Sequence, residues 1–534
     1  MLRRCCYVLL LLGLLMPLPA GAAPRPLVEV QVLSISDWHG QLDPISVAGT
    51  GNVGGAAVLS SYWKAERSRN PNTLTLTAGD AFGATPPLSS FFDEEPTVKA
   101  MNLMGLGADT LGNHNFDRGL PHLQRMIDLA RFPFVAANLR DLESNLTGVS
   151  PYVLREVAGV TVGIVGVTNP DAASLVFPGR MGALEVTDPV PAANRARAAA
   201  QAAGAKITIA ITHMGVTGRD ASGAPTGPLV DFANGVGGFD LILGDHTDVQ
   251  FSGVVNGQLV VENRSKGVTY ARTTLGVDIL NGRVARSSVE FVTPVAGAVT
   301  PDPEIETMLR PYRSELSARN DVPIGVAEDV FVRGGNERIA EAAIGNIAAD
   351  SMRQRYGTQI AFTNGGGLRA GLPSSYRPRD TSLRRTSAGY AAGPPYDLVV
   401  GDVYAVLPFG NAVVTRTLTG AQLHAALELS VSRLPAPSGG FLQVSGLRFE
   451  YDSDRPAGSR IVSVTLDDGT PIPPDQSRYS AATNDFLNGG GDGYTMLADG
   501  AGVTRELMAD VLLDHIRAAG TVRPATEGRI RDIR

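Results

Sequence analysis

The chain reads Gly112-Asn113-His114-Asn115-Phe116-Asp117 directly after a short apolar segment. This stretch places an amide, an imidazole and a carboxylate close together. Similar clusters of Asp and His follow β-type apolar segments at residues 36–40, 78–80, 212–215 and 244–248. Divalent metal ions bind carboxylate, imidazole and carbonyl groups. A strand that ends in such a residue presents it at one edge of a sheet, so we predict that these stretches together build one metal site.

Each of these residues also has an ordinary explanation, because an Asp after Gly is commonly a turn residue and most isolated His side chains are not ligands. The joint pattern favours a metal site. Asp37 and His39 are two residues apart and can turn toward one ion, and Asp248 follows His246 at the same spacing. Asp80 stands alone and suits a bridging role between two ions. Such a pair of ions can hold a phosphate and activate water.

Strand and helix signals alternate through the first half of the chain. We predict strands at 28–36, 73–77, 159–167, 207–211 and 240–243, and helices at 56–67, 97–104, 120–129 and 192–203. This alternation is typical of a layered α/β domain. The pattern breaks near 293–303 and a helix follows at 304–318, so we place the domain junction within 295–325. For the second half we predict an α+β domain with a helix at 337–356 and a mobile surface loop at 373–395.

Composition narrows the class of protein. The chain has 534 residues, of which 43% are hydrophobic and 19% are charged, as expected for a globular protein with more than one domain. A net charge of −7 argues against a broad basic surface for a nucleic acid polymer. Residues 1–23 read as a secretory signal, with Arg3 and Arg4 before an apolar run that is too short to span a membrane. Cys5 and Cys6 lie in this segment, so we expect a mature protein without disulfides.

The order of these motifs resembles the calcineurin-like metallophosphoesterase superfamily. Within it, the chain resembles the bacterial periplasmic 5′-nucleotidase / UDP-sugar hydrolase family over nearly the whole mature chain. The resemblance implies an α/β fold class: a four-layer α/β-sandwich metallophosphoesterase domain at 24–300, a hinge helix within 301–325, and a C-terminal α+β substrate-binding domain at 326–534. It also implies that the two domains move relative to each other during turnover.

The family resemblance further implies two divalent metal ions, zinc or manganese. Matched residue by residue, one ion is expected on Asp37, His39, Asp80 and Asp248, and the other on Asp80, Asn113, His213 and His246. His114 and Asp117 match the family's catalytic pair, in which the carboxylate orients the imidazole. The alternative for Asp117 is the N-cap of a helix that begins near Leu120.

One motif departs from the family pattern. The family usually has Gly at the position of Asp245 and His at the position of Asp248. Asp248 can still bind a metal. Because a carboxylate is a harder ligand than an imidazole and carries a negative charge, the site would favour hard cations more strongly. We therefore hypothesise a preference for manganese or another hard ion over zinc.

The second half carries a predicted nucleoside pocket. Phe409 and Phe486 lie beside polar groups in separate segments, and two Phe rings can sandwich a planar base. The resemblance implies base stacking by these two residues, nucleoside contacts from Asn411 and Asp492, and phosphate binding by Arg369. A further Arg that the family uses has no clear match, and Arg384 or Arg385 could serve.

These expectations describe an exported, periplasmic or secreted monomer that hydrolyses nucleotide phosphate esters, with no membrane partner after signal removal. The same motifs leave other enzymes open: a 2′,3′-cyclic-nucleotide phosphodiesterase/3′-nucleotidase, a UDP-sugar or dinucleotide pyrophosphatase, or a thiosulfate-processing relative. A non-enzyme alternative is a nucleotide-binding protein that has lost turnover.

Overall fold

The structure is a computed structural model that describes residues 27–47 and 49–534. The predicted signal segment and both cysteines lie outside the described residues. Within the described part of the chain, every helix falls short of the length and apolar character needed to cross a bilayer.

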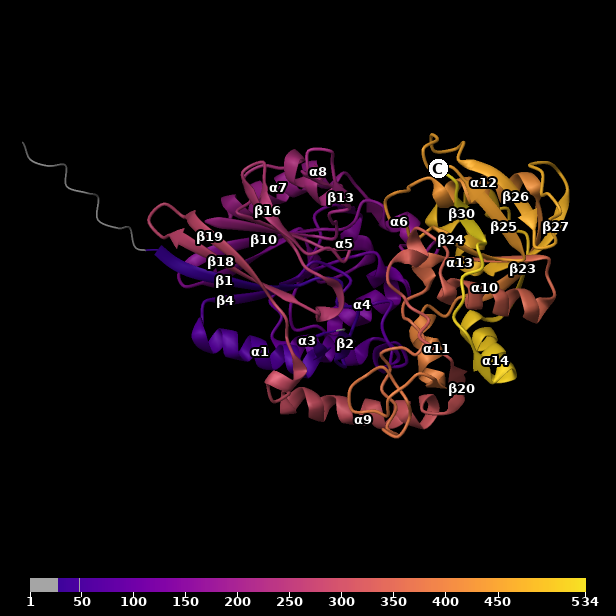
Figure 1. Cartoon of the computed structure of the whole chain (residues 1–534). Helices are drawn as coiled ribbons and strands as arrows, with labels where there is room; N and C mark the ends of the chain where they lie inside the picture. The colour runs from indigo at the N-terminus through magenta and orange to yellow at the C-terminus, as the bar shows by residue number, and fades with distance from the viewer. Residues whose placement is uncertain (1–26, 48) are drawn as a thin grey trace, which may run out of the picture.

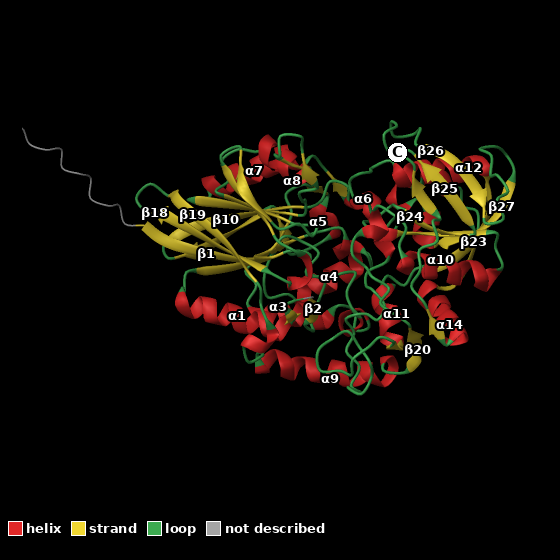
Figure 2. Cartoon of the chain, viewed as in Figure 1, coloured by secondary structure: helices red, strands yellow, loops and turns green. Residues whose placement is uncertain are grey.

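Two β-sheets form the centre of the first half (Figure 2). One has the strand order β19-β18-β1-β4, in which β1 runs parallel to β4 and antiparallel to β18. The other has the order β16-β17-β15-β12-β10-β9, with β10, β12, β15 and β17 parallel. The strands of the first sheet are β1 (Leu27–Ile35), β4 (Thr73–Thr77), β18 (Tyr270–Asp278) and β19 (Arg283–Val292). Those of the second are β9 (Tyr152–Val157), β10 (Val160–Val167), β12 (Ile207–Thr212), β15 (Leu241–Gly244), β16 (Phe251–Val255) and β17 (Gln258–Glu262).

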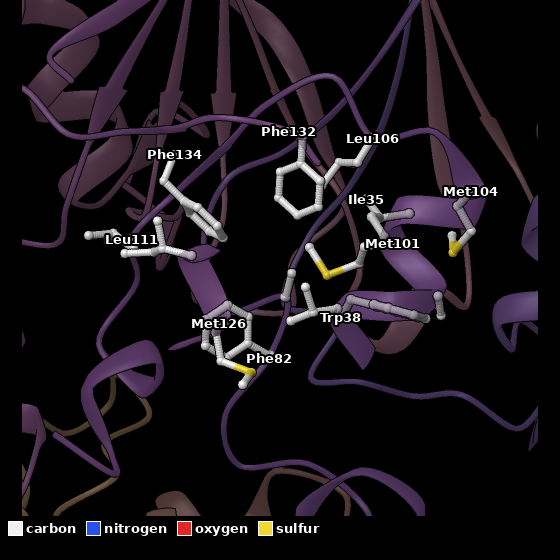
Figure 3. Close-up of a cluster of buried hydrophobic side chains, with 14 of the residues drawn as sticks. Ile35, Trp38, Phe82, Met101, Met104, Leu106, Leu111, Met126, Phe132 and Phe134 are labelled. Carbon is white, nitrogen blue, oxygen red and sulfur yellow. The ribbon is translucent and has the colours of Figure 1, made fainter. Parts of the chain in front are cut away.

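The sheets pack face to face, and helices cover both outer faces. Alternation along β1 explains this arrangement: Val30 and Val32 join the apolar layer between the sheets, whereas Leu33 and Ile35 face the helices. Figure 3 shows part of the helix-side core, in which Trp38 lies near Met101 and Phe82 near Met126. The helices on that side are α1 (Ala56–Arg69), α3 (Glu95–Met104), α4 (Leu120–Leu129) and α9 (Pro303–Asn320); α7 (Pro189–Ala202) and α8 (Pro228–Gly235) cover the other face. The predicted four-layer α/β sandwich is confirmed.

Helix α9 leads from the first half to the second along the lower edge of the molecule (Figure 1). The second half contains a five-stranded sheet of order β24-β21-β27-β23-β28 and two three-stranded sheets, so its predicted α+β character is confirmed. The five strands are β21 (Ile360–Asn364), β23 (Ala412–Thr419), β24 (Leu442–Ser445), β27 (Arg478–Asn484) and β28 (Val503–Leu507). The principal helices are α10 (Ala343–Tyr356), α11 (Val400–Val406), α12 (Gly420–Val431) and α14 (Met508–Ala519).

Helix α10 is shorter than the sequence predicted. It begins at Ala343 instead of 337, and residues Asn336–Arg338 form a separate 3₁₀ turn. The N–H of Ala342 donates to the side chain of Gln443, which fixes an extended residue just before the helix. Apolar periodicity alone did not reveal this tertiary contact. As a consequence, Arg338 lies on a turn and not on the helix.

The segment 373–395 contains no helix or strand, in agreement with the prediction, but the structure anchors it. Arg385 is buried and both of its terminal nitrogens donate to the carboxylate of Asp402, at 2.6 Å each. The hydroxyl of Tyr376 also donates to Asp321, directly after α9, at 2.6 Å. The segment therefore ties the second half of the chain to α9.

Candidate active site

Most of the predicted metal-site residues gather where strands of the two large sheets and of a smaller third sheet end. Asp37 and His39 follow β1, Asp80 follows β4, His213 follows β12, and His246 follows β15. Asn113 and His114 follow β5 (Asp109–Thr110). Parallel strands point their carboxyl ends to the same edge, so residues far apart in the sequence meet there.

The donor atoms of these side chains form overlapping groups in which all atoms lie within 4.8 Å of one another. One group contains Asp37, His39 and Asp80, and a second contains Asp80, His213 and His246. Asp80 is shared, as a bridging carboxylate requires. Its Oδ2 atom lies 3.0 Å from Nε2 of His213, and Nδ1 of His246 lies 3.1 Å from the same Nε2.

Asn113 and Asp245 supply the observation that tests whether metal ions fit. Oδ1 of Asn113 and Oδ2 of Asp245 are buried and have no hydrogen-bond partner among the described residues. Buried acceptors without donors cost free energy, and a cation offsets that cost. Together with the carboxylates and imidazoles beside them, these oxygen atoms form a donor set suited to divalent ions. The residues present therefore fit the predicted metal centre.

The structure does not group Asp248 with the other predicted ligands. Asp248 is exposed, and its Oδ1 accepts hydrogen bonds from the N–H and hydroxyl of Ser265 at 2.8 and 2.9 Å. Asp245 is instead fully buried and forms a third donor group with Asp37 and His213. From the sequence, Asp245 stands out only as a departure from the family pattern, because spacing along the chain does not show which way a side chain points in a turn.

Backbone conformation in this cluster is unusual. Asp37, His39 and Asp80 have φ values of 40°, 47° and 46°, and His246 has a φ of 84°. Non-glycine residues rarely adopt this left-handed region, and such residues concentrate at functional sites. The strained turns aim the side chains at a common point that extended strands would not reach.

Burial and mutual charge shift the pKa values of the cluster. Burial lowers the pKa of His213, but the Asp80 carboxylate outweighs this effect and raises it to about 9. Burial and the positive charge of His213 lower the pKa of His246 to about 3. Burial and the negative charge of Asp37 raise the pKa of Asp245 well above its usual range.

His114 and Asp117 form a hydrogen-bonded pair, with 2.9 Å between Nδ1 and Oδ2. The N–H of His114 also donates to Oδ1 of Asp80 at 2.8 Å, which fixes the pair beside the predicted ligands. Helix α4 begins at Leu120 with Gly119 as its N-cap, so Asp117 does not cap this helix. The His114 ring stacks on Phe409 of the second half, with 5.4 Å between ring centroids.

A cavity of about 200 Å³ lies between the two halves of the chain and adjoins this pair. All five predicted substrate-pocket residues line it: Arg369, Phe409, Asn411, Phe486 and Asp492. Asn113, His114, Asp117 and His246 line it from the first half. The cavity therefore connects the ligand cluster directly to the two Phe rings. Nδ2 of Asn364 donates to Asp492 at 2.9 Å and positions its carboxylate.

Besides Arg369, the cavity is lined by Arg180 and Arg338. Arg384 and Arg385 are paired with Asp397 and Asp402 and do not line the cavity, whereas Arg338 does. Arg338 was not predicted as a site residue, because it falls within the helix predicted at 337–356. The Gly334-Gly335 pair just before it was the available signal for a turn.

Lys266 adds a further positive charge beside Arg369. Its Nζ donates to the backbone oxygen of Arg369 at 3.3 Å, which joins the first half to the second. Burial and the nearby charge of Arg333 lower the pKa of Lys266 to about 7 and that of Arg369 to about 9. Crowded, buried cations of this kind favour an anionic ligand.

Comparisons with known proteins agree with this geometry. Residues 323–499 match the family model of the 5′-nucleotidase C-terminal domain. A solved 5′-nucleotidase precursor from Thermus thermophilus has a TM-score of 0.83 and 29% identity, and the match covers 95% of this chain and 100% of that one. A snake venom 5′-nucleotidase from Gloydius brevicauda is 27% identical over 98% of this chain and 92% of its own length.

The endonuclease YhcR from Bacillus subtilis is 28% identical over 87% of this chain, but this chain spans only 37% of that relative. The comparisons confirm both the resemblance and the two-domain fold predicted from the sequence.

Proposed function

We propose that this chain is a phosphoric-ester hydrolase of the 5′-nucleotidase type, as its similarities to such proteins support, and that it removes the phosphate of nucleoside 5′-monophosphates at a two-metal centre. One observation carries the proposal: a single cavity is lined both by His246 of the cluster around Asp80 and by Phe409 and Phe486. A nucleotide has a phosphate at one end and a planar base at the other, and this cavity offers a partner for each.

The proposed ligands are Asp37, His39, Asp80, Asn113, His213 and His246, with Asp245 as a further carboxylate of the centre. Asp80 would hold both ions because it belongs to two donor groups. When bound, the ions would polarise the phosphoryl oxygens and lower the pKa of a water molecule. The left-handed backbone at Asp37, His39 and Asp80 holds their side chains in place before the substrate arrives.

His114 acts on the phosphoryl or leaving oxygen. Its Nδ1–H donates to Asp117, which fixes the ring orientation and leaves Nε2 to exchange a proton with the substrate. Arg369 and Arg338 would neutralise the phosphate charge, and Arg369 lies within hydrogen-bond reach of His39 at 3.2 Å. Phe409 and Phe486 would stack on the base, while Asn411 and Asp492 contact the nucleoside.

The location and assembly of the protein belong to the same proposal. We expect an exported, monomeric enzyme, and one relative, from Listeria monocytogenes, is named a cell wall protein. The domain limits proposed from the sequence remain 24–300 and 326–534, with a hinge in α9.

A phosphate-release screen tests the function. The purified enzyme is incubated with AMP, 3′-AMP, 2′,3′-cyclic AMP and UDP-glucose in the presence of manganese, zinc or cobalt. We expect release from AMP with at least one metal and loss of release in Asp80→Ala. Faster release from 3′-AMP and cyclic AMP would identify the 3′-nucleotidase alternative. Tight nucleotide binding without any turnover would identify a binding protein.

Metal content tests the identity of the ions. The extra Asp245 carboxylate makes the site harder, so we expect manganese in the protein purified without chelator. Asp245→Gly should shift the bound metal toward zinc, as measured by elemental analysis. Exclusive zinc in the unmodified protein would contradict this expectation.

A further inference from the structure

One end of the cavity carries a carboxylate with no role in the chemistry above. Asp485 is the first residue of helix α13 (Asp485–Asn488), directly before Phe486, and both residues line the cavity. Oδ1 of Asp485 is buried and lacks a hydrogen-bond partner in the described part of the chain, although the backbone N–H groups of Ala412 and Phe486 lie near the carboxylate and favour its charged form. An unpaired buried carboxylate oxygen is costly unless an occupant of the cavity donates to it. Asp485 is therefore positioned to accept a hydrogen bond from a ligand.

Arg180 lines the same cavity from the first half of the chain. Burial raises the pKa of Asp485, whereas the backbone N–H groups of Ala412 and Phe486 and, to a smaller degree, the charge of Arg180 act against this shift. The guanidinium of Arg180 lies over the ring of Phe177, 5.8 Å from its centroid. The cavity thus presents an acceptor and a group of donors near the base-stacking ring of Phe486.

Contacts between the two halves fix this arrangement. A Cβ atom added to Gly489 would lie 3.5 Å from Cγ of Pro178, which is ordinary van der Waals contact. The segment 177–180 therefore lies against the turn that follows Phe486. Neither half of the chain alone would bring Arg180 and Asp485 together.

The four bases differ in what they offer such a pair. A carboxylate is an acceptor only, whereas a guanidinium is a donor only. Guanine places two donors side by side, N1–H and N2–H, and its O6 and N7 atoms are acceptors. Adenine and cytosine each place one amino group beside a ring acceptor. Uracil has a single N–H between two carbonyl oxygens. Guanine is the base that matches a carboxylate and a guanidinium together.

We propose that Asp485, assisted by Arg180, selects the base and that the cavity prefers guanine nucleosides and nucleotides. This inference rests on the proposed function only in taking a nucleoside as the occupant. Phe409 and Phe486 hold any base by stacking, and Asp485 discriminates at the base edge.

Binding of free nucleosides tests this proposal without turnover. Calorimetric titration of the full chain with guanosine, adenosine, cytidine and uridine should give the lowest Kd for guanosine, by about fivefold or more. Asp485→Asn should abolish this preference and raise the affinity for adenosine relative to that for guanosine, because an amide can both donate and accept a hydrogen bond. The control is Asp514→Asn, an exposed aspartate of α14 in the same half of the chain, which should behave as the unmodified protein does.

Equal affinity for all four nucleosides in the unmodified protein would overturn the proposal. An equal loss of affinity for every nucleoside in Asp485→Asn would also overturn it, since that result indicates a structural role. If Asp485→Asn fails to fold, Arg180→Met provides the test. This variant should bind guanosine more weakly than the unmodified protein does and should bind uridine with unchanged affinity. If the enzyme releases phosphate from none of the nucleotides, the proposed function is contradicted, but the binding measurement with nucleosides remains a valid test of the base preference.

Discussion

Single glycines allow the donor groups to approach one another. Gly112 precedes Asn113, and a Cβ at Gly112 would overlap with Oδ1 of Asp80. A Cβ at Gly79 would likewise lie 2.8 Å from Nδ1 of His213, inside contact distance. The Gly residues of these motifs are therefore required by close approach as well as by turn geometry.

Gly112→Ala should displace Asp80 and weaken metal binding by about 10- to 100-fold, the range seen when ligand positioning is lost. Elemental analysis and metal titration would measure this effect. The matched control is Gly237→Ala, because a Cβ at Gly237 would meet no atom within 4 Å. Unchanged metal affinity in Gly112→Ala would contradict the close-approach argument.

Asp117→Asn should lower kcat for AMP by about 100-fold or more while KM changes little, because Asp117 orients His114 without contacting the base. Steady-state kinetics on AMP would show the split between kcat and KM. Asp128→Asn changes an exposed aspartate of the neighbouring helix α4 and serves as the control. A rise in KM with normal kcat would instead assign Asp117 to substrate binding.

At the scale of elements, the loops after β12 and β15 rest on the end of β17. Glu262, the last residue of β17, is 1% exposed; it accepts from the N–H of Val216 at 2.7 Å and also from the hydroxyl of Thr247. Burial raises the pKa of Glu262 to about 8. The carboxyl group therefore supports the two loops in its protonated form.

This raised pKa makes stability depend on pH. Between pH of about 4.5 and 8, the folded chain binds a proton at Glu262 that the unfolded chain does not, so this contribution to stability is lost as pH rises. Relative to Glu262→Gln, the free energy of unfolding of the unmodified protein should fall by up to about 1.4 kcal/mol per pH unit across this window. Urea unfolding of chelator-treated protein at pH 5, 6, 7 and 8 would measure the difference.

Glu315→Gln, at an exposed position of α9, should show no such trend against the unmodified protein. A constant difference between Glu262→Gln and the unmodified protein across the four pH values would contradict the assignment.

At the scale of the whole molecule, the site exists only where the two halves meet. His114 stacks on Phe409, Lys266 binds the backbone of Arg369, and Phe91 packs edge-on against Tyr404 with ring centroids 5.1 Å apart. Substrate enclosed between the halves needs a path in and out. Separation of the halves during each turnover is therefore expected.

A reversible crosslink tests this motion. A Cβ at Gly489 would lie 3.5 Å from Cγ of Pro178 across the halves. Pro178→Cys combined with Gly489→Cys should therefore form a disulfide in a chain that lacks residues 1–23 and thus has no other cysteine. We expect the oxidised form to lose AMP turnover by about tenfold or more and to recover on reduction. Each single variant is a control. Full turnover in the oxidised double variant would show that the halves need not separate here.

The sequence by itself determined the layered fold and most of the donor set. Alternation along β1 and the neighbouring strands fixed which faces are buried, and the motifs at the strand ends required their Asp and His side chains to gather at one edge. These features are local, since the period of a strand and the residue that follows it can be read directly from the chain.

Only the tertiary structure decided the rest. It brought Asp245 and not Asp248 into the cluster, ended the 3₁₀ turn at Arg338 before α10 begins, and placed Arg180 and Asp485 on the wall of one cavity. Each of these outcomes depends on the direction of a side chain in a turn or on contact between distant segments. Such contacts are settled by packing across the two halves, for which spacing along the chain gives no information.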